Sequence, residues 1–175
     1  MPKHSSTNFK KDVIVYKLQK KLFNINDFRC KKQEYADYLK KDAFDDQKNS
    51  IGQTWVFVYK QAVVIGYVTI AMAELNKNHD QKLKNFPHSH IPALLVGQLA
   101  THQDYESLGV GKHMIYWVIA EAINYSNNIG CKLIILNPGE DVILWYKRKL
   151  GFIHVPKSRR NPDLMYYNLA WYKIK

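Results

Sequence analysis

The stretch "LATHQDYESLGVGKHMI", residues 99–115, decides the fold of this chain. It starts at the end of an apolar, strand-like segment and crosses a polar loop. The loop ends in Leu108-Gly109-Val110-Gly111-Lys112, and the apolar, periodic run that follows predicts a helix. Glycines let a backbone approach an anion closely, and the first N–H groups of a helix attract negative charge. The stretch therefore predicts a strand, a phosphate-binding loop and a helix in succession.

Two familiar phosphate-binding loops do not fit these residues. A P-loop needs a glycine, four residues and then Gly-Lys-Ser/Thr, but His113 follows Gly111-Lys112, and Glu106 stands where the first glycine belongs. A dinucleotide-binding loop needs a third glycine after Gly-x-Gly, and the positions after Lys112 hold His113 and Met114 instead. The sequence argues against both classes of nucleotide-binding loop.

The segment 106–111 resembles the acyl-CoA-binding motif Gln/Arg-x-x-Gly-x-Gly/Ala of the GNAT superfamily of N-acetyltransferases, with Glu106 in place of Gln or Arg. The stretch "IPALLVGQLATHQDY" (91–105) is similar to the central strand and turn of that family. "LIILNPGEDVILWYKRKLGFIHV" (133–155) is similar to its next strand, helix and Tyr-x-x-x-Leu-Gly-Phe signature. "FNINDFRCKKQEYADYLKKDA" (23–43) resembles an N-terminal pattern of one branch, which includes toxins that acetylate the amino acid on charged tRNA.

The resemblance implies acetyl-CoA as cosubstrate, no metal, and a set of cofactor-binding residues. In the family, the central strand binds the acetyl and pantetheine groups, the glycine loop binds the pyrophosphate, and a residue after the next strand adds a contact. The corresponding residues here are Leu99, Ala100, Thr101, Ser107, Leu108, Gly109, Val110, Gly111, Lys112 and Asn137. For the strand residues, the alternative is that their side chains only fill a buried strand.

The resemblance also assigns a catalytic role to Tyr146, which matches the tyrosine of the family signature. A thiol has a pKa near ~8.5 and a phenol near ~10, so a neutral phenol at the CoA sulfur can stabilise or protonate the departing thiolate. The alternative is a core aromatic residue with a satisfied hydroxyl, because Trp145 beside it is also aromatic.

A general base is harder to identify. Glu74 and His102 are candidates, with surface or turn residues as the alternative for each. A lysine amine has a pKa of about 10.4, whereas an α-amine has one of about 7.7–8.0 and already carries a neutral fraction at pH 7. An aminoacyl-tRNA acceptor therefore needs less help from a base than a protein lysine does.

Several other classes of protein and site are disfavoured. The two cysteines, Cys30 and Cys131, make no disulfide framework, and no apolar run approaches the ~18 residues of a membrane span. We therefore expect a cytoplasmic protein. Of the histidines, only His88 and His90 lie close together, without the pattern of a metal site. The strip Met165, Tyr166, Tyr167, Leu169 and Trp171 is read as sheet core and edge rather than a base-stacking platform.

Apolar periodicity predicts a single α/β domain over residues 1–175, with 1–12 as a candidate flexible basic arm. The resemblance makes this a GNAT-like, mixed, mostly antiparallel sheet flanked by helices. Lys60-Gln61 predicts a hairpin turn, and 76–92 predicts a loop. The predicted strands are 13–22, 55–59, 63–73, 93–100, 132–136, 152–155 and 164–171, and the predicted helices are 31–48, 110–125 and 141–149.

The net charge of +11 is concentrated at the two ends of the chain. Residues 1–41 hold eleven Lys/Arg against four Asp/Glu, and residues 142–175 hold eight against one, whereas the middle is mildly acidic. Basic ends indicate either solubility or a surface for a polyanion. If the substrate is tRNA, the candidate contacts are Lys31, Lys32, Lys147 and Lys149.

The leading hypothesis is thus an acetyl-CoA-dependent N-acetyltransferase acting on a primary amine, with the α-amine of aminoacyl-tRNA as the specific expectation. The toxin branch implies a DNA-binding antitoxin as partner, and homodimers are common in it. The alternatives are a protein or small-molecule amine acetyltransferase, and a non-catalytic module that binds CoA or nucleic acid. Glu106 in the loop keeps the last alternative open.

Overall fold

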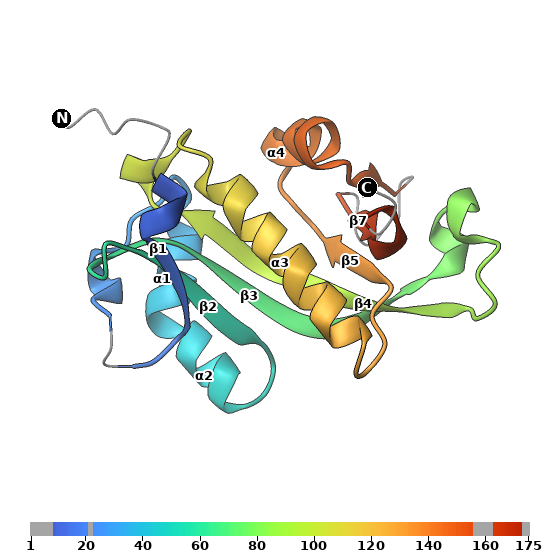
Figure 1. Ribbon diagram of the computed structural model, residues 1–175, viewed down its shortest axis with the longest axis horizontal. Coiled ribbons are helices and arrows are strands. Elements are labelled where there is room, and N and C mark those ends of the chain that lie inside the picture. The colour runs from blue at the N-terminus through green and yellow to red at the C-terminus, as the bar shows by residue number, and fades with distance from the viewer. Residues whose placement is uncertain (1–8, 21–22, 156–162, 173–175) are drawn as a thin grey trace. The chain divides into compact units, whose positions relative to one another are not determined.

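The computed structural model describes residues 9–20, 23–155 and 163–172. Its strands form one sheet in the order β1-β2-β3-β4-β5-β7-β6 (Figure 1). Pairing is antiparallel at β1–β2, β2–β3, β5–β7 and β6–β7, and parallel at β4–β5. The predicted α/β class with a mixed, mostly antiparallel sheet is therefore confirmed. The strands are β1 (Val13–Lys17), β2 (Gln53–Tyr59), β3 (Val63–Asn76), β4 (His90–Thr101), β5 (Leu133–Leu136), β6 (Ile153–His154) and β7 (Met165–Asn168). The helices are α1 (Gln33–Lys41), α2 (Ala43–Lys48), α3 (Val110–Ser126) and α4 (Glu140–Trp145).

The chain divides into two compact units. The first comprises residues 1–70 and 98–117, and the second residues 71–97 and 118–175. In the first unit, β2 and β3 form the predicted hairpin at Lys60 and Gln61, whose φ angles are 48° and 58°. The Ala62 N–H donates to the Tyr59 carbonyl at 3.1 Å. Two positive φ angles make this the turn type that matches the natural twist of paired strands.

The two faces of β2 carry different side chains. Val56 and Val58 belong to the apolar cluster formed with α1 and α2, which lie beside β2 in Figure 1. Trp55 and Phe57 alternate with these valines along the strand and contact Trp117 of α3. The ring centroids lie 5.1 Å apart for Trp55 and 5.7 Å apart for Phe57. The alternation follows from the two-residue period of a strand. It seats the first half of α3 on the sheet.

Gly66 of β3 explains how closely α3 approaches that sheet. A Cβ at this position would lie 2.8 Å from Sδ of Met114 and 3.1 Å from the carbonyl oxygen of Ala100. A side chain at 66 would therefore have to move the end of the Met114 side chain and shift the Ala100 carbonyl slightly. The absence of a side chain there leaves space for Met114 of α3 and for the Ala100 carbonyl of β4 beside β3.

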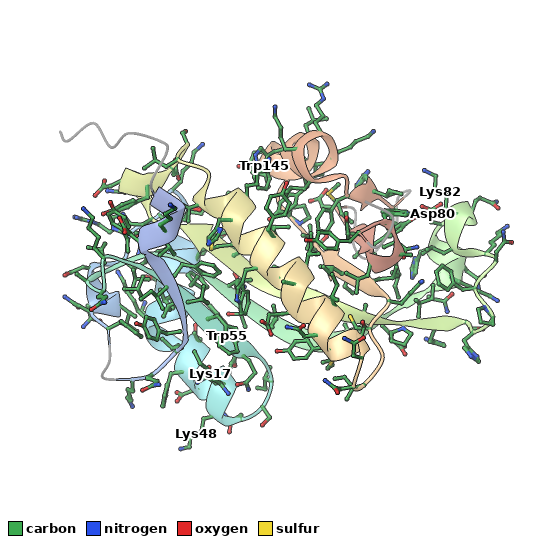
Figure 2. All side chains as sticks on the ribbon, viewed as in Figure 1. Lys17, Lys48, Trp55, Asp80, Lys82 and Trp145 are labelled. Carbon is green, nitrogen blue, oxygen red and sulfur yellow. The ribbon has the colours of Figure 1, made fainter. Side chains whose placement is uncertain are left out.

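The second unit has its core on β5 and β7. β5 pairs in register from Leu133↔Ala93 to Leu136↔Val96 on β4, and antiparallel with β7 on its other side. The loop 77–89 packs onto this core through Asp80, which accepts a hydrogen bond from the Tyr166 hydroxyl at 2.9 Å. Figure 2 shows Asp80 and Lys82 on that loop. The buried core residues are Leu75, Leu83, Ile91, Ala93, Leu133, Ile135, Val155, Leu164 and Tyr166.

Several predicted boundaries were wrong. The predicted helix 31–48 is two helices that meet at Asp42, with φ −109° and ψ −36°. Aspartate is a poor residue for a helix interior because its side chain competes for backbone hydrogen bonds. The first strand ends at Lys17 rather than residue 22. The loop predicted over 76–92 is shorter, because β3 runs to Asn76 and β4 begins at His90.

The C-terminal predictions also need correction. The helix predicted over 141–149 is α4 followed by a π-helical turn, Tyr146–Leu150. The strand predicted over 164–171 ends at Asn168, whose side chain accepts from the Ala170 N–H at 3.0 Å and starts a 3-10 turn. Most of the predicted arm 1–12 lies outside the described residues, and Phe9–Asp12 forms a 3-10 turn.

No helix in the described part of the chain is both long and apolar enough to cross a membrane.

Candidate functional site

The glycine loop lies between the end of β4 and the start of α3, as the sequence predicts. Ser107 and Gly109 both have positive φ angles, 64° and 84°. The Gly109 carbonyl accepts from the His113 N–H at 3.0 Å and so makes the first hydrogen bond of the helix. Helix geometry then leaves the N–H groups of Val110, Gly111 and Lys112 without acceptors inside the helix. Three N–H groups and the positive end of α3 meet at this loop.

The loop has room for a ligand at Gly109. A Cβ built there would meet no atom within 4 Å, although the φ of +84° disfavours any L side chain. Glu106, Ser107 and Gly109 are exposed, and Leu108 is half-buried. Open space beside unpaired N–H groups suits a phosphate. These residues therefore fit the pyrophosphate of CoA.

The strand residues before the loop differ in burial. Ala100 is buried, whereas Leu99 and Thr101 are half-buried. The Ala100 carbonyl would be 3.1 Å from a Cβ at Gly66, so its backbone faces β3 at close range. The structure thus places these three residues directly before the loop, and their contact with a pantetheine group remains a prediction.

Glu106, the departure from the family motif, lies near Cys30. Burial is the main cause that raises the pKa of the Cys30 thiol, and the Glu106 carboxylate contributes to the same direction. Lys40 acts on the thiol in the opposite direction. The Glu106 charge therefore acts on the segment before α1.

The two candidate bases have other partners. His102 is buried, with its Nδ1 accepting from the Asp104 N–H at 3.2 Å and its Nε2 3.4 Å from the Asp27 carbonyl oxygen. Glu74 is exposed, and its Oε1 lies 2.6 Å from Nδ1 of His90. These contacts favour the turn and surface alternatives over a general base in both cases.

In the second unit, Asn137 is exposed directly after β5, and Tyr146 begins the π-helical turn. The Tyr146 ring is buried, edge-on to Trp145 at 4.9 Å and to Phe152 at 5.5 Å between centroids. Its carbonyl accepts from the N–H groups of Gly151 and Phe152. Figure 2 labels Trp145 on this helix. The ring is packed as a core aromatic would be, and the role of its hydroxyl remains a prediction.

The predicted substrate lysines lie at two places in the chain. Lys31 is exposed and Lys32 half-buried, directly before α1 in the first unit. Lys147, Arg148 and Lys149 are all exposed on the π-helical turn of the second unit. The other basic residues between 142 and 175 lie outside the described residues. Each cluster is accessible to a polyanion.

The described ranges contain no group of three or more His, Cys, Asp or Glu side chains positioned to hold a metal ion. His88 is exposed, and His90 is paired with Glu74. Met165, Tyr166 and Leu169 are buried, as expected for sheet core rather than a stacking platform.

Sequence reasoning missed one connection at the site. The Gln103 N–H, at the start of the turn before the loop, donates to the Arg29 carbonyl at 2.8 Å. The segment before α1 therefore binds the backbone that leads into the loop. A single hydrogen bond between residues far apart in sequence leaves no periodic pattern, so the sequence held no direct signal for it.

Comparisons with known proteins agree with this geometry. Among solved structures, AtaT complexed with acetyl-methionyl-tRNAfMet is 18% identical with a TM-score of 0.84, covering 93% of this chain and 98% of AtaT. A point mutant of KacT gives the same four values. AtaTR bound with AcCoA is 18% identical with a TM-score of 0.77, covering 94% of this chain and 98% of that one. At these identities the likeness shows the fold alone.

No curated protein matches the chain. The model of the acetyltransferase (GNAT) family matches residues 15–152, which include β2 to β5, the glycine loop, Tyr146 and Phe152. With the fold and the loop in agreement, the chain belongs to the acetyltransferase (GNAT) family and is an N-acetyltransferase.

Proposed function

We propose that this N-acetyltransferase transfers the acetyl group of acetyl-CoA to the α-amine of an aminoacyl-tRNA. The observation that carries the proposal is the likeness, over 93% of the chain, to AtaT, which was solved with acetyl-methionyl-tRNAfMet. The concentration of positive charge at both ends of the sequence supports a polyanionic substrate.

In this proposal the glycine loop binds the pyrophosphate of acetyl-CoA. The N–H groups of Val110, Gly111 and Lys112 donate to phosphate oxygens, and Gly109 leaves the space that they occupy. Ser107 and Leu108 complete the loop. The end of β4 (Leu99, Ala100 and Thr101) and Asn137 contact the acetyl and pantetheine groups. Acetyl-CoA supplies a thioester, and the amine attacks its carbonyl carbon.

Tyr146 is the proposed general acid. As the C–S bond breaks, its hydroxyl donates a proton to the sulfur of CoA, because a phenol is neutral at pH 7 and a free thiolate is a poorer leaving group than a thiol. The phenolate regains a proton from the one that the attacking nitrogen loses as the amide forms. The ring is held between Trp145 and Phe152, which restricts its orientation. A rigid ring keeps the hydroxyl in one position during the reaction.

The acceptor amine must be neutral to attack the thioester. An α-amine with a pKa of about 7.7–8.0 has a neutral fraction at pH 7 without a strong base. The occupied ring nitrogens of His102 and the contact of Glu74 with His90 agree with such an acceptor. A protein lysine with a pKa of about 10.4 would need a base to remove its proton.

Lys31, Lys32, Lys147 and Lys149 are the proposed contacts to tRNA phosphates. Two related structures carry further partners: AtaT bound to the C-terminus of the antitoxin AtaR, and a KacTA–DNA complex. By this likeness we propose a toxin that acts in the cytoplasm as one N-acetyltransferase domain. A DNA-binding antitoxin and a second copy of the chain would be its partners.

The alternatives are acetylation of a protein or small-molecule amine, and a module that binds CoA or nucleic acid without turnover. Only Glu106 favours the last of these, because its charge lies next to the phosphate loop. Purified protein with radiolabelled acetyl-CoA separates them. We expect label in aminoacylated tRNA, none in deacylated tRNA, and little with Tyr146→Phe. Label in protein or small amines only would reject the tRNA acceptor.

A further inference from the structure

His102 lies at a junction between two segments of the first unit. It follows β4 directly, and its own N–H donates to the Ile65 carbonyl at 2.8 Å. His102 as a residue is only 6% exposed. The Phe28 and Tyr105 rings lie edge-on to its imidazole, with ring centroids 5.6 and 5.8 Å away. The imidazole is therefore buried and in contact with two aromatic rings.

The two ring nitrogens of His102 serve different segments. Nδ1 accepts from the Asp104 N–H at 3.2 Å and so caps the 3-10 turn Gln103–Tyr105. An acceptor at Nδ1 leaves the proton of the neutral ring on Nε2. That nitrogen lies 3.4 Å from the Asp27 carbonyl oxygen, to which it donates. The Asp104 carboxylate is 3.8 Å from Nδ1, too far for a hydrogen bond.

Each of these segments leads to a part of the candidate site. The capped turn continues through Glu106 into the glycine loop and the start of α3. The segment at Asp27 continues through Arg29, whose carbonyl accepts from the Gln103 N–H at 2.8 Å, to Lys31 and Lys32 before α1. His102 thus connects the acetyl-CoA side with the side proposed for the acceptor.

We propose that His102 is a positioning residue that couples acetyl-CoA binding at the glycine loop to the order of the segment 25–30. The Nδ1 cap holds the turn that sets the loop, and the Nε2 donor transmits the restraint to Asp27. Binding of acetyl-CoA then restrains the backbone that presents Lys31 and Lys32. The inference rests on the proposed cofactor loop, but not on tRNA as the acceptor.

Two substitutions separate the two nitrogens. The amide of His102→Asn reaches the Asp104 N–H as Nδ1 does, but it is too short to reach Asp27. The amide of His102→Gln reaches toward Asp27 as Nε2 does, but it does not cap the turn. His88→Asn, at an exposed position in the loop 77–89, is the matched control.

The experiment combines calorimetry with hydrogen exchange, using acetyl-CoA alone as the probe. In the wild-type protein, acetyl-CoA should slow the exchange of amides in residues 25–30. His102→Asn should bind acetyl-CoA within about twofold of wild type but lose this protection. His102→Gln should bind it roughly three- to tenfold more weakly, as expected for one lost neutral hydrogen bond. The control should match the wild type in both measurements.

Three results would overturn the proposal. The first is unchanged exchange of 25–30 in the wild-type protein when acetyl-CoA binds, a result that needs no variant. The second is wild-type behaviour of both His102 variants. The third is a large loss of turnover in His102→Asn at saturating acetyl-CoA with affinity and protection intact, which would make His102 a base. If the wild-type protein does not bind acetyl-CoA at all, the proposed function fails as well.

Discussion

The Tyr166 hydroxyl donates to the Asp80 carboxylate at 2.9 Å, and both residues are buried in the second unit. The other carboxylate oxygen of Asp80 accepts from the Lys82 N–H at 3.0 Å and starts a 3-10 turn. One carboxylate therefore joins strand β7 to the loop 77–89. Without the Tyr166 hydroxyl, the buried Asp80 carboxylate would lose one of its two hydrogen-bond donors.

Tyr166→Phe should lower the free energy of unfolding by about 1.5–3 kcal/mol, because it leaves a buried carboxylate without one of its donors. Asp80→Asn should cost less, since the amide oxygen can accept from the Lys82 N–H while the amide NH2 donates to the Tyr166 hydroxyl oxygen. Urea unfolding followed by circular dichroism measures both values. The neighbouring exposed residue Lys82→Ala serves as control and should have little effect. Equal stability of Tyr166→Phe and wild type would remove the pair from the account.

Buried tyrosines should make the protein sensitive to alkali. Burial raises the pKa of Tyr67 and of Tyr166, and for Tyr166 the Asp80 carboxylate raises it further. In the unfolded chain the same groups ionise near their ordinary pKa of about 10, so the unfolded state loses protons that the folded state keeps. Their contribution to stability is therefore full below pH of about 10 and declines above it. Urea midpoints measured between neutral and strongly alkaline pH should show this decline, and the decline should be smaller in Tyr67→Phe.

Gly109→Val should weaken acetyl-CoA binding strongly, because a β-branched side chain would fill the open space beside the first N–H groups of α3. Gly130→Val is the control for the effect of backbone strain alone. Gly130 is exposed, has a similar φ of +72° and has equally open surroundings. Calorimetry on both folded variants compares the affinities. Equal affinities would mean that the loop does not hold the cofactor. Gly111→Val, inside the first turn of the helix, should also weaken binding.

Tyr146→Phe should leave acetyl-CoA affinity nearly intact and lower turnover by ~10²–10⁴-fold, as is typical for loss of a general acid. The ring keeps its contacts with Trp145 and Phe152, so folding should not suffer. Steady-state kinetics at saturating acetyl-CoA provides the test, with thermal melting as the check on folding. A turnover number like that of the wild type would make Tyr146 a packing residue.

Lys147→Ala combined with Lys149→Ala should weaken the binding of charged tRNA without affecting acetyl-CoA. Each lost phosphate contact should flatten the slope of log affinity against log salt by roughly 0.7–0.9, so the pair should change it by about one to two. Lys82→Ala combined with Lys84→Ala removes the same charge from two exposed positions of the loop 77–89. A slope that changes equally in both double variants would show that general charge, not the π-helical turn, attracts tRNA.

The sequence predicted the parts of the fold that depend on local patterns. The strand, loop and helix around Gly109 were predicted because apolar periodicity and glycine placement are local signals. The turn at Lys60-Gln61 was predicted for the same reason. The break between α1 and α2 was not, because the apolar spacing continues across Asp42 and a single residue interrupts it.

Features that depend on tertiary contacts were beyond the reach of sequence patterns. The π-helical turn after Tyr146 depends on the left-handed Gly151, whose φ is +76°, and on the packing of Phe152 against Tyr146. The link from Arg29 to Gln103 depends on backbone atoms far apart in sequence. The two roles of the His102 ring nitrogens depend on the same neighbourhood. The sequence shows only that His102 follows the central strand, a position that made it a candidate base.

The central claim is that the acetyl group ends on the α-amine of an aminoacyl-tRNA. The most direct measurement is mass spectrometry of tRNA and protein from cells that express the chain while acetyl-CoA carries an isotopic label. We expect labelled N-acetyl-aminoacyl-tRNA, absent when Tyr146→Phe is expressed instead. Label confined to protein amines or small molecules, with aminoacyl-tRNA unlabelled, would contradict it.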